Sequence, residues 1–421
     1  MNSSNFKSDI PKILLLVAFL LLSHSAFAEI LYVLNSQSRT LSRIDLSTNT
    51  VNNSFAQLGN VPNKVLVTDD YLYVVNSGDN SLRKISKTSG ATLANHFIAI
   101  GSNPWDAIIH EDYIYVSGLF TAMVYKLDAS SGQVLASVPV GTAPEAMAIA
   151  NGKLYVTNAG NYAQNYAGSS VSVIDLASFS VVKTITTGLN PQYIRLFDGM
   201  VHVSCTGNWT DAPGEIYVID SETDEVAHIV PIGGSPGNIW INGDGLAYVA
   251  DGSGYSLYSY DANTFSALNP ASDPLPYAVS DLAGTAGMIA LVDPNWGSNA
   301  QVSVLNPDLS PRSTFTVGMM PSDIKMDVEP VSVSDQIAPV PQTLIKVYPS
   351  PIRASAELKL KSLARNAGEF RLYNIKGERI HSSHLYPGEE KTLSFDLPAG
   401  TYIYSYGSAG IRNTGKLVVL P

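Results

Sequence analysis

The chain has 421 residues, of which 45% are hydrophobic and 14% charged, and 25 basic against 36 acidic residues give it a net charge of −11. This composition excludes an intrinsically disordered chain, which is poor in hydrophobic residues and rich in charge. With 32 glycines, 24 prolines and 22 tyrosines, the chain is typical of a β protein with many turns.

The first 28 residues have the pattern of a secretory signal peptide. Lys7 and Lys12 precede an apolar run, Ile13–Leu22, that is short for a membrane-spanning helix and leads to an Ala-Phe-Ala sequence ending at Ala28. We therefore expect residues 1–28 to be removed and the protein to be secreted or displayed on the outer cell surface. No other segment is apolar enough to span a bilayer, so we expect no transmembrane helix in the mature chain.

Residues 29–329 repeat one pattern of short strands seven times. Each repeat has a strand such as Leu154–Asn158 (LYVTN), a strand ending in a pair such as Ile174-Asp175, and a glycine–proline corner such as Gly188/Pro191. By subtraction, successive corner prolines are 40 to 47 residues apart, a period that with four strands per repeat predicts a β-propeller. The corner prolines are Pro62, Pro104, Pro144, Pro191, Pro236, Pro276 and Pro321.

The repeats also predict how the ring closes. The chain enters at the second strand of a repeat, Ile30, and leaves with a lone strand, Ser322–Val328, which we expect to become the innermost strand of the first blade. The fold class is therefore an all-β, seven-bladed propeller closed by its terminal strands, which leaves no open sheet edge. At each corner we expect glycine to supply a positive φ and proline to begin the next inner strand. We expect the Asp of each Ile-Asp pair to cap a turn and the only cysteine, Cys205, to be a buried thiol at a strand end.

The motifs Tyr-Val-x-Asn, Ile-Asp and Gly-x-x-Pro resemble the YVTN family of β-propeller repeats. The resemblance covers residues 29–329 and implies the architecture. It does not imply one function, because similar propellers occur in surface-layer proteins and beside lactonases, lyases and quinoprotein dehydrogenases.

Variation around the ring indicates a ligand-binding face. Loops from the fourth strand to the next first strand, and from the second to the third, emerge on the same side. The longest of them are Ala159–Ser169, Thr206–Gly214 and Pro294–Asn299, whose aromatic, Asn and Asp residues suit a polysaccharide, a peptide or a protein. The alternative is that these aromatic rings only pack the loops onto the rim. The candidate binding residues are Trp105, Asp106, Glu145, Tyr162, Tyr166, Gln192, Trp209, Asn238, Tyr277, Trp296 and Asp323.

An enzymatic function is the alternative hypothesis. Asp106, Glu145 and Asp323 are candidates for a general base at the mouth of the channel, as in a lactonase, a lyase or a quinoprotein dehydrogenase. However, the chain has no HExxH motif, phosphate loop, nucleophile elbow or Cys/His cluster. We expect no catalytic residue, no cofactor and no metal; the turn Asn76–Asn80 is interpreted as a polar turn, with calcium binding as the alternative.

Charge divides the chain into two parts. Residues 29–339 carry 12 basic and 29 acidic residues, a net charge of −17, and residues 340–421 carry 11 and 6, a net charge of +5. The acidic part argues against binding to nucleic acid, which needs clustered Lys and Arg. Residues 330–340 are predicted to be a linker because they combine proline and serine without a strand pattern.

Residues 341–421 predict a small Ig-like β-sandwich, because seven short strand candidates are separated by turns. Four segments resemble the C-terminal sorting domain of the type IX secretion system: Tyr348-Pro-Ser-Pro351, Phe370–Gly377, Leu397–Ile403 and Lys416–Leu420. The resemblance implies that the type IX secretion machinery is a partner. Ser350 and Pro421 depart from the family pattern and leave a generic Ig-like domain of the flagellar-hook-cap type as the alternative. The candidate sorting residues are Tyr348, Pro349, Pro351, Gly377, Gly400 and Lys416.

The sequence thus predicts an exported propeller that acts as a ligand-binding or scaffold module and is not an enzyme. Its ligand and its oligomeric state stay open.

Overall fold

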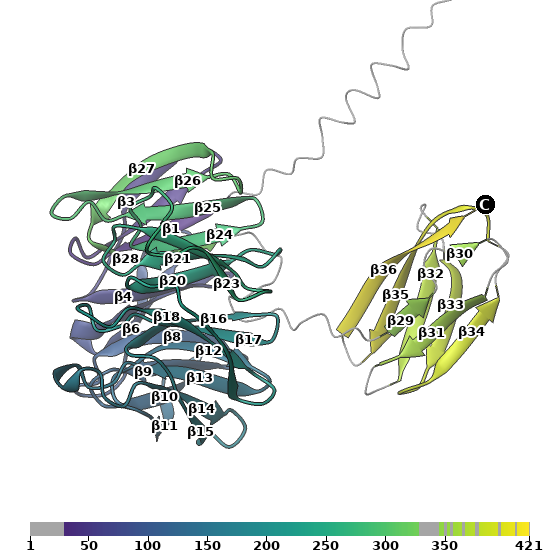
Figure 1. Ribbon diagram of the computed structural model, residues 1–421, viewed down its shortest axis with the longest axis horizontal. Coiled ribbons are helices and arrows are strands. Elements are labelled where there is room, and N and C mark those ends of the chain that lie inside the picture. Colours follow the sequence, from purple (N-terminus) through teal and green to yellow (C-terminus); the bar gives the residue numbers. More distant parts are fainter. Residues whose placement is uncertain are drawn as a thin grey trace, which may run out of the picture. The chain divides into compact units, whose positions relative to one another are not determined.

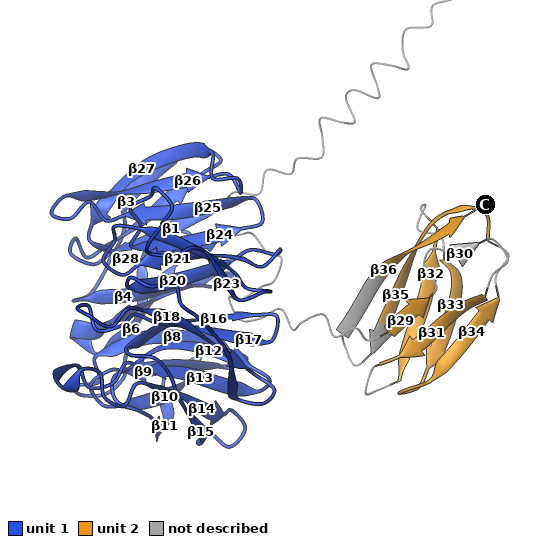
Figure 2. Ribbon diagram, viewed as in Figure 1, with its two compact units in different colours: residues 1–337 blue, residues 338–421 orange. Residues whose placement is uncertain are grey.

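The structure is a computed structural model that describes residues 29–327, 345–348, 352–353, 357–363, 367–374, 379–394, 397–408 and 411–420. The chain divides into two compact units, residues 1–337 and 338–421 (Figure 2). The predicted signal peptide and linker lie outside the described residues, as do Pro349, Pro351 and Gly377. Over the described ranges the fold is all-β, and no helix there is long and apolar enough to cross a membrane.

The first unit is a ring of seven four-stranded antiparallel sheets (Figure 1). We number the sheets 1 to 7 in chain order and name each strand by its place, from the inner strand to the fourth, outer strand. Sheet 1 consists of β28 (Pro321–Asp327), β1 (Ile30–Asn35), β2 (Thr40–Asp45) and β3 (Thr50–Gln57). Sheet 2 consists of β4 (Pro62–Val67), β5 (Tyr71–Asn76), β6 (Ser81–Ser86) and β7 (Thr92–Phe97), and a 3-10 turn, η1 (Ser77–Asp79), joins β5 to β6. Sheet 3 consists of β8 (Pro104–His110), β9 (Tyr113–Gly118), β10 (Met123–Asp128) and β11 (Val134–Pro139).

The remaining four sheets repeat this order. Sheet 4 consists of β12 (Pro144–Ala150), β13 (Lys153–Asn158), β14 (Ser170–Asp175) and β15 (Ser180–Thr186), with η2 (Tyr162–Gln164) between β13 and β14. Sheet 5 consists of β16 (Pro191–Phe197), β17 (Met200–Cys205), β18 (Glu215–Asp220) and β19 (Glu225–Val230). Sheet 6 consists of β20 (Pro236–Ile241), β21 (Leu246–Asp251), β22 (Leu257–Asp261) and β23 (Ser266–Asn269). Sheet 7 consists of β24 (Asp281–Thr285), β25 (Met288–Asp293), β26 (Asn299–Leu305) and β27 (Pro311–Met319).

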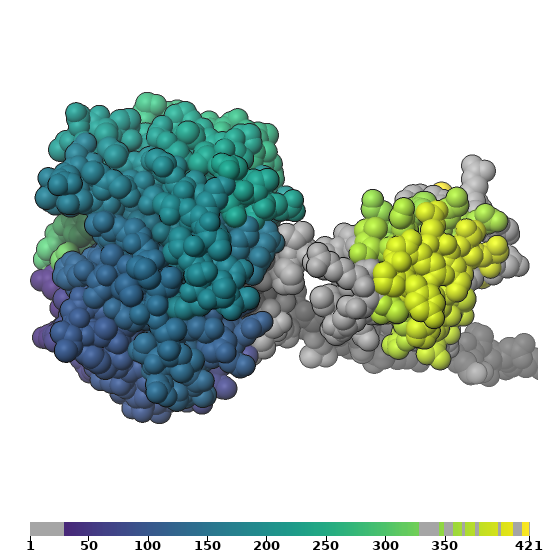
Figure 3. Space-filling model, turned by 90° about the horizontal axis from the view of Figure 1, so that it is seen from below, coloured from purple at the N-terminus to yellow at the C-terminus, as the bar shows by residue number. Residues whose placement is uncertain are grey.

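The ring is closed by its two terminal strands, as the sequence predicted. Strand β28 pairs antiparallel with β1, so that Ile30 lies opposite Asp327 and Val33 opposite Ile324. Each inner strand also contacts the inner strands of both neighbouring sheets, and β28 contacts both β24 and β4. In the space-filling view, segments that follow one another in the chain, and therefore have similar colours, lie next to each other in this unit (Figure 3).

The core of the ring consists of one apolar cluster between each pair of neighbouring sheets. Side chains that alternate along a strand point to opposite faces. On β1, Leu31 and Val33 therefore pack against sheet 7, whereas Ile30 and Tyr32 pack against sheet 2. This two-sided burial explains why the second strands are almost continuously apolar in sequence. Cys205, at the end of β17, is a buried free thiol, as predicted.

The corners between sheets differ from the prediction in one respect. The predicted positive φ is found at the corner glycines Gly101 (φ 67°) and Gly233 (φ 75°), but Gly141 has none, and there it falls on Ala143 (φ 54°), the residue before the proline. Glycine is needed there for space: a methyl group at Gly141 would lie 2.5 Å from Cγ of the buried Asn158. At three corners, those of Gly59, Gly141 and Gly318, the glycine thus packs against the Asn that ends a second strand.

The connection from sheet 6 to sheet 7 is also different. The sequence placed an inner strand directly after Pro276, but β24 begins only at Asp281. This corner lacks the glycine, and residues 270–280 instead form an irregular segment in which the N–H of Leu275 donates to the carbonyl of Leu257 at 2.9 Å.

The second unit has two sheets that share one core. The three-stranded sheet has the order β29 (Ile345–Tyr348), β31 (Glu357–Ser362), β34 (Glu390–Ser394). The five-stranded sheet has the order β30 (Ile352–Arg353), β36 (Ile411–Leu420), β35 (Gly400–Ser408), β32 (Gly368–Tyr373), β33 (Arg379–Leu385). Leu358 and Leu360 of the first sheet pack against Phe370, Leu372 and Tyr406 of the second. All seven predicted strand candidates are strands, and β30 is an additional one.

Candidate functional site

The two ends of the ring expose different side chains. At one end, which we call the loop end, second strands connect to third strands and fourth strands connect to the next inner strand; the other connections form the turn end. Among the described residues of the ring, every exposed large apolar side chain lies on a fourth strand or in a loop-end connection. Those of the loop end are Val61, Ile100, Phe120, Tyr162, Trp209, Tyr255, Trp296 and Met320.

The turn end is polar because its turns are capped by aspartates, as predicted. The Asp128 carboxylate accepts hydrogen bonds from the N–H groups of Ser130 (3.1 Å) and Ser131 (2.7 Å) and from both of their hydroxyls. These bonds, led by that from the Ser130 hydroxyl, lower the pKa of Asp128 to about 2. Equivalent turns are capped by Asp45, Asp175, Asp220 and Asp261.

The loop of sheet 4, Ala159–Ser169, places two tyrosines at the loop end. The side chain of Asn161 accepts a hydrogen bond from the N–H of Ala163 (3.0 Å) and so caps the short helix η2. The rings of Tyr162 and Tyr166 meet edge to face, with centroids 5.5 Å apart. Tyr166 is buried, and the ring of Tyr162 therefore stands on a fixed support.

The loop of sheet 5, Thr206–Gly214, presents Trp209. The side-chain oxygen of Asn208 accepts hydrogen bonds from the N–H groups of Thr210 (3.1 Å) and Ala212 (2.9 Å), and its Nδ2 donates to Asn165 of the neighbouring loop (3.0 Å). Trp209 itself has a φ of 64°. A left-handed backbone is unusual for a bulky residue, and such strain gathers at functional positions.

Sheets 6 and 7 extend this surface. A methyl group at Gly252 would lie 2.8 Å from Cη2 of Trp209, and one at Gly254 would lie 3.2 Å from Cζ2 of Trp296. The loops of sheets 4 to 7 are thus in contact one after another. We call their exposed rings the aromatic arc; its members and their exposed fractions are Tyr162 (77%), Trp209 (44%), Tyr255 (70%) and Trp296 (48%).

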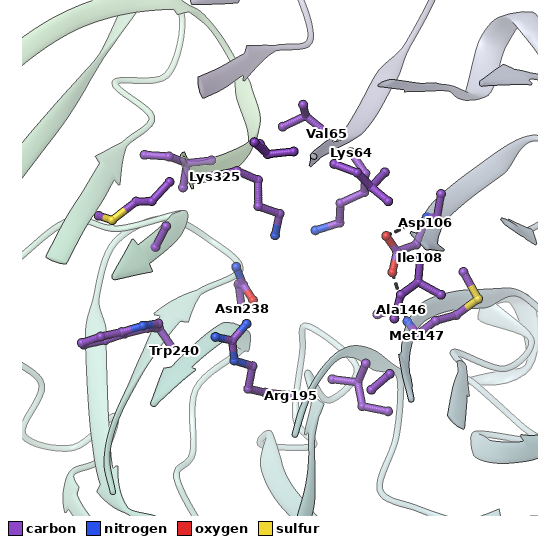
Figure 4. Close-up of a pocket in the computed structure, with 18 of the residues that line it drawn as sticks. Lys64, Val65, Asp106, Ile108, Ala146, Met147, Arg195, Asn238, Trp240 and Lys325 are labelled. Atoms are coloured by element: carbon purple, nitrogen blue, oxygen red, sulfur yellow. Dashed lines mark hydrogen bonds between the residues drawn. The ribbon is translucent and has the colours of Figure 1, made fainter. Parts of the chain in front are cut away.

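A cavity of about 910 Å³ runs along the axis of the ring and is lined by residues of all seven inner strands. Its walls combine apolar side chains, such as Ile108, Met147 and Trp240, with charged ones (Figure 4). Three cations, Lys64, Arg195 and Lys325, line it together with the carboxylates of Asp69, Asp106, Glu111 and Asp327.

Carboxylates near the loop end join neighbouring inner strands. Asp106 accepts hydrogen bonds from the N–H groups of Ala107 (2.8 Å) and, on the next strand, Met147 (3.0 Å). Asp281 accepts in the same way from Ile324 (3.1 Å), and Asp323 from Val65 (2.8 Å). The predicted site residues Asp106 and Asp323 therefore hold backbone groups of the adjoining sheets.

Two more of the predicted polar residues take part in this network. Asn238 donates from Nδ2 to Oδ1 of Asp281 at 2.7 Å. Burial, and after it the charge of Asp323, raises the pKa of Asp281 to about 6. Burial also raises the pKa of Glu145 to about 8, and a hydrogen bond from Gln192 and the charge of Lys64 oppose this shift. At neutral pH, Glu145 is thus largely protonated.

Lys64 occupies the centre of the charged cluster. Its Nζ lies 3.3 Å from Oδ1 of Asp323 and 5.2 Å from the ring centroid of Tyr193 on sheet 5. Although burial opposes it, the carboxylates of Asp323 and Asp281 raise the pKa of Lys64, which keeps the ammonium group charged.

The remaining candidates lie in three places. Trp105 is half-buried beside Asp106 on β8, and Gln192 accepts a hydrogen bond from the Thr206 hydroxyl (3.1 Å) at the base of the Trp209 loop. Tyr277 lies apart: its ring belongs to the core between sheets 6 and 7, and its hydroxyl donates to the carbonyl of Leu309 (3.1 Å).

Sequence reasoning missed two sets of residues. Tyr255 stands in a loop too short to attract notice, Gly252–Ser256. The cations of the cavity, Lys64, Arg195 and Lys325, lie two or four positions after a corner proline. A comparison of all seven repeats at those positions would have shown them.

The sorting residues that the structure describes lie on strands of the second unit. Tyr348 ends β29, Gly400 begins β35, and Lys416 is exposed on β36 opposite Ile403. In the described part of the chain, no group of three or more His, Cys, Asp or Glu side chains is placed to hold a metal ion.

Comparison with solved structures supports the propeller fold. The structure of apo AztD from Citrobacter koseri is similar over 72% of this chain and 98% of its own, with 12% identity and a TM-score of 0.50. The computationally designed Ika8 protein is 10% identical over 84% of this chain and 95% of its own, with a TM-score of 0.47. No curated protein sequence matches the chain.

Comparison with protein families identifies the second unit. Residues 346–420 match the family described as a secretion system C-terminal sorting domain. The matched range contains all six candidate sorting residues and nearly all of the unit. The chain therefore ends in a sorting domain of the type IX secretion system, which supports its secretion and its targeting to the cell surface.

Proposed function

We propose that this protein is an exported, seven-bladed β-propeller of the YVTN kind that binds a polysaccharide at its loop end and is not an enzyme. In this proposal the Ig-like C-terminal domain is recognised by the type IX secretion machinery, and the propeller is its cargo. The observation that carries the proposal is the difference between the two ends of the ring: exposed aromatic rings stand at the loop end, whereas aspartates cap the turns of the other end.

The shape of the aromatic arc favours a chain-like ligand. Its rings come from four successive sheets and stand beside polar groups such as Asn165, Asn208 and Asp211. The C–H face of a sugar ring packs on an aromatic face, while side-chain amides and carboxylates bond its hydroxyls. Rings held by separate loops leave space for successive sugar units.

Glycan and peptide arrays test this proposal. We expect the purified protein to bind at least one polysaccharide and the Trp209→Ala, Trp296→Ala double variant to lose most of that binding. A matched control is the Leu135→Ala, Ile229→Ala double variant, which removes exposed apolar side chains from the outer strands β11 and β19 and should bind normally. Binding to peptides alone, or equal binding by both double variants, contradicts the proposal.

A second candidate, enzymatic acid–base chemistry at the channel mouth, is favoured by one observation. Glu145 is a buried carboxyl group with a pKa of about 8, and groups whose pKa values lie near the working pH suit general acid–base catalysis. Array-positive glycans should therefore also be incubated with the protein and analysed for cleavage. Turnover that Glu145→Gln abolishes, with glycan binding retained, would favour the enzyme.

A further inference from the structure

We propose that the axial cavity binds a small organic anion, whose carboxylate or phosphate group is held by Lys64, Lys325 and Arg195. This site is separate from the aromatic arc and does not depend on the function proposed for it. The structure supports the inference through the placement of cations, the use of the nearby carboxylates and the size of the cavity.

The placement of the cations is selective. Residues 29–339 contain only 12 basic residues against 29 acidic ones, yet three of the 12 line this one cavity. They come from inner strands of sheets 1, 2 and 5, on different sides of the axis. Figure 4 shows the ends of Lys64 and Lys325 turned toward each other and the guanidinium group of Arg195 pointing into the same space.

The cavity is narrow where the cations meet. Lys64 extends from sheet 2 to within 5.2 Å of the Tyr193 ring centroid on sheet 5. Arg195 lies two residues beyond Tyr193 on the same strand. An anion at this level lies between cations of different sheets, and charge-assisted hydrogen bonds from Lys and Arg to a carboxylate or a phosphate are strong.

The buried carboxylates next to the cations accept hydrogen bonds from backbone N–H groups. Asp323 is fully buried outside the cavity lining and accepts the N–H of Val65, and Asp281 accepts the N–H groups of Leu282 (2.8 Å) and Ile324 (3.1 Å). Lys64 has three N–H donors, and one of them is used by Oδ1 of Asp323 at 3.3 Å.

Lys64 and Lys325 share the buried carboxylate of Asp323, whose Oδ1 lies 3.3 Å from one ammonium group and 3.8 Å from the other. A buried ion pair adds little net stability compared with apolar residues of similar size, and bringing two ammonium groups together opposes folding. An anionic ligand would supply further negative charge between these two ammonium groups.

The rest of the cavity limits the shape of this ligand. Ile108 and Met147 on one side of the cavity and Trp240 on the other give its lining apolar parts (Figure 4), and Asp69, Glu111 and Asp327 give the turn end a negative charge. A volume of about 910 Å³ is in the range of sites for small molecules. The ligand is therefore an organic anion with an apolar part, and its charged group lies on the loop-end side of the acidic residues.

Binding to defined probes tests the inference. The purified protein is titrated at low salt with glucuronate and citrate as carboxylates, with inorganic phosphate and glucose 6-phosphate as phosphates, and with glucose as a neutral control. We expect saturable binding of at least one anion by calorimetry, a rise of the unfolding temperature with its concentration, and no response to glucose.

Variants locate the binding site. Lys325→Gln and Arg195→Gln should each weaken binding about tenfold or more, and Lys325→Arg should retain it. Lys183→Gln is the matched control, because Lys183 pairs with Glu225 on the outer face of the ring. No saturable binding up to about 10 mM, or wild-type affinity in both Lys325→Gln and Arg195→Gln, would overturn the inference.

Bromide soaked into crystals of the unmodified protein decides the question if a variant fails to fold. An anomalous peak among Lys64, Arg195 and Lys325 supports the site, and bromide found only elsewhere overturns it. The aromatic arc contains none of these residues, so a failure here leaves the polysaccharide proposal intact.

Discussion

The side chain of Asp323 and the backbone N–H of Val65 are 258 residues apart in the chain and are joined by a hydrogen bond of 2.8 Å. The other carboxylate oxygen lies 3.3 Å from Nζ of Lys64. This one carboxylate therefore ties the last strand of the ring, β28, to the inner strand of sheet 2.

Asp323→Asn should destabilise the ring, because it removes the negative charge beside the enclosed Lys64. Breaking a buried pair from one side costs about 3–5 kcal/mol, and we expect a loss near the lower end because asparagine can still accept the bond from Val65. The free energy of unfolding in urea measures the effect. Glu225→Gln breaks the exposed pair with Lys183 and should cost less than about 1 kcal/mol; equal losses in the two variants would contradict the role of Asp323.

Asn208→Ala should weaken polysaccharide binding although Asn208 is not itself in the aromatic arc. Its side-chain oxygen holds three backbone N–H groups of the loop that presents Trp209. Loss of such bonds, at about 1 kcal/mol each, should reduce affinity at least about fivefold with little change in unfolding temperature. Asn263→Ala removes a comparable side chain at the turn end, where Asn263 bonds the carbonyl of Asp244, and should leave binding unchanged.

Glu145→Gln should change how stability depends on pH. The pKa of Glu145 is raised from its ordinary value of 4.5 to about 8 in the folded protein. Between these values the folded state binds more protons, so Glu145 makes the protein less stable as pH rises from about 4.5 to 8. The glutamine variant should match the wild type at pH 5 and exceed it at pH 9, by on the order of a few kcal/mol. Urea unfolding at several pH values measures this, and parallel pH profiles of the two proteins would refute it.

His202 should have the opposite effect on the pH dependence of stability. It is fully buried, its Nδ1 lies 2.9 Å from the Tyr260 hydroxyl, and burial lowers its pKa from 6.5 to about 3. The unfolded state therefore binds more protons in this window, and stability is lost as pH falls from about 6.5 to 3. His202→Gln should make the acid side of the stability profile less steep, and an unchanged slope would contradict this role of His202. Thermal unfolding between pH 3 and 7 distinguishes the two outcomes.

Much of the architecture could be predicted because the chain repeats itself. The strand Ile30–Asn35 and the pairing of the terminal strands follow from periodicity alone, since one register error would place apolar side chains outside both neighbouring cores. The predicted cause of the corner glycine holds at Gly101 and Gly233, which have positive φ, but not at Gly141. Gly141 makes room for Asn158, a residue 17 positions later that no local rule of backbone conformation takes into account.

The candidate site was harder to predict. Trp209 and Trp296 were found because they stand in long insertions, whereas Tyr277 was included on the basis of a corner that does not form. The cavity cations escaped notice because each of them, alone, looks like an ordinary charged residue in a strand. Only the closure of the ring brings Lys64 and Arg195, 131 positions apart by subtraction, to one axis.

The pairing of β28 with β1 has a consequence for the order of events in export. Strand β1 precedes all the other strands of the ring in the chain, but its partner β28 ends at Asp327, after all of them. Until that point the first sheet has an unpaired edge, so a prematurely ended chain cannot hide it. Sheet closure thus distinguishes a finished chain from a truncated one. The sorting domain is synthesised only after the closing strand, so every copy that carries this export signal also contains the segment needed to complete its cargo.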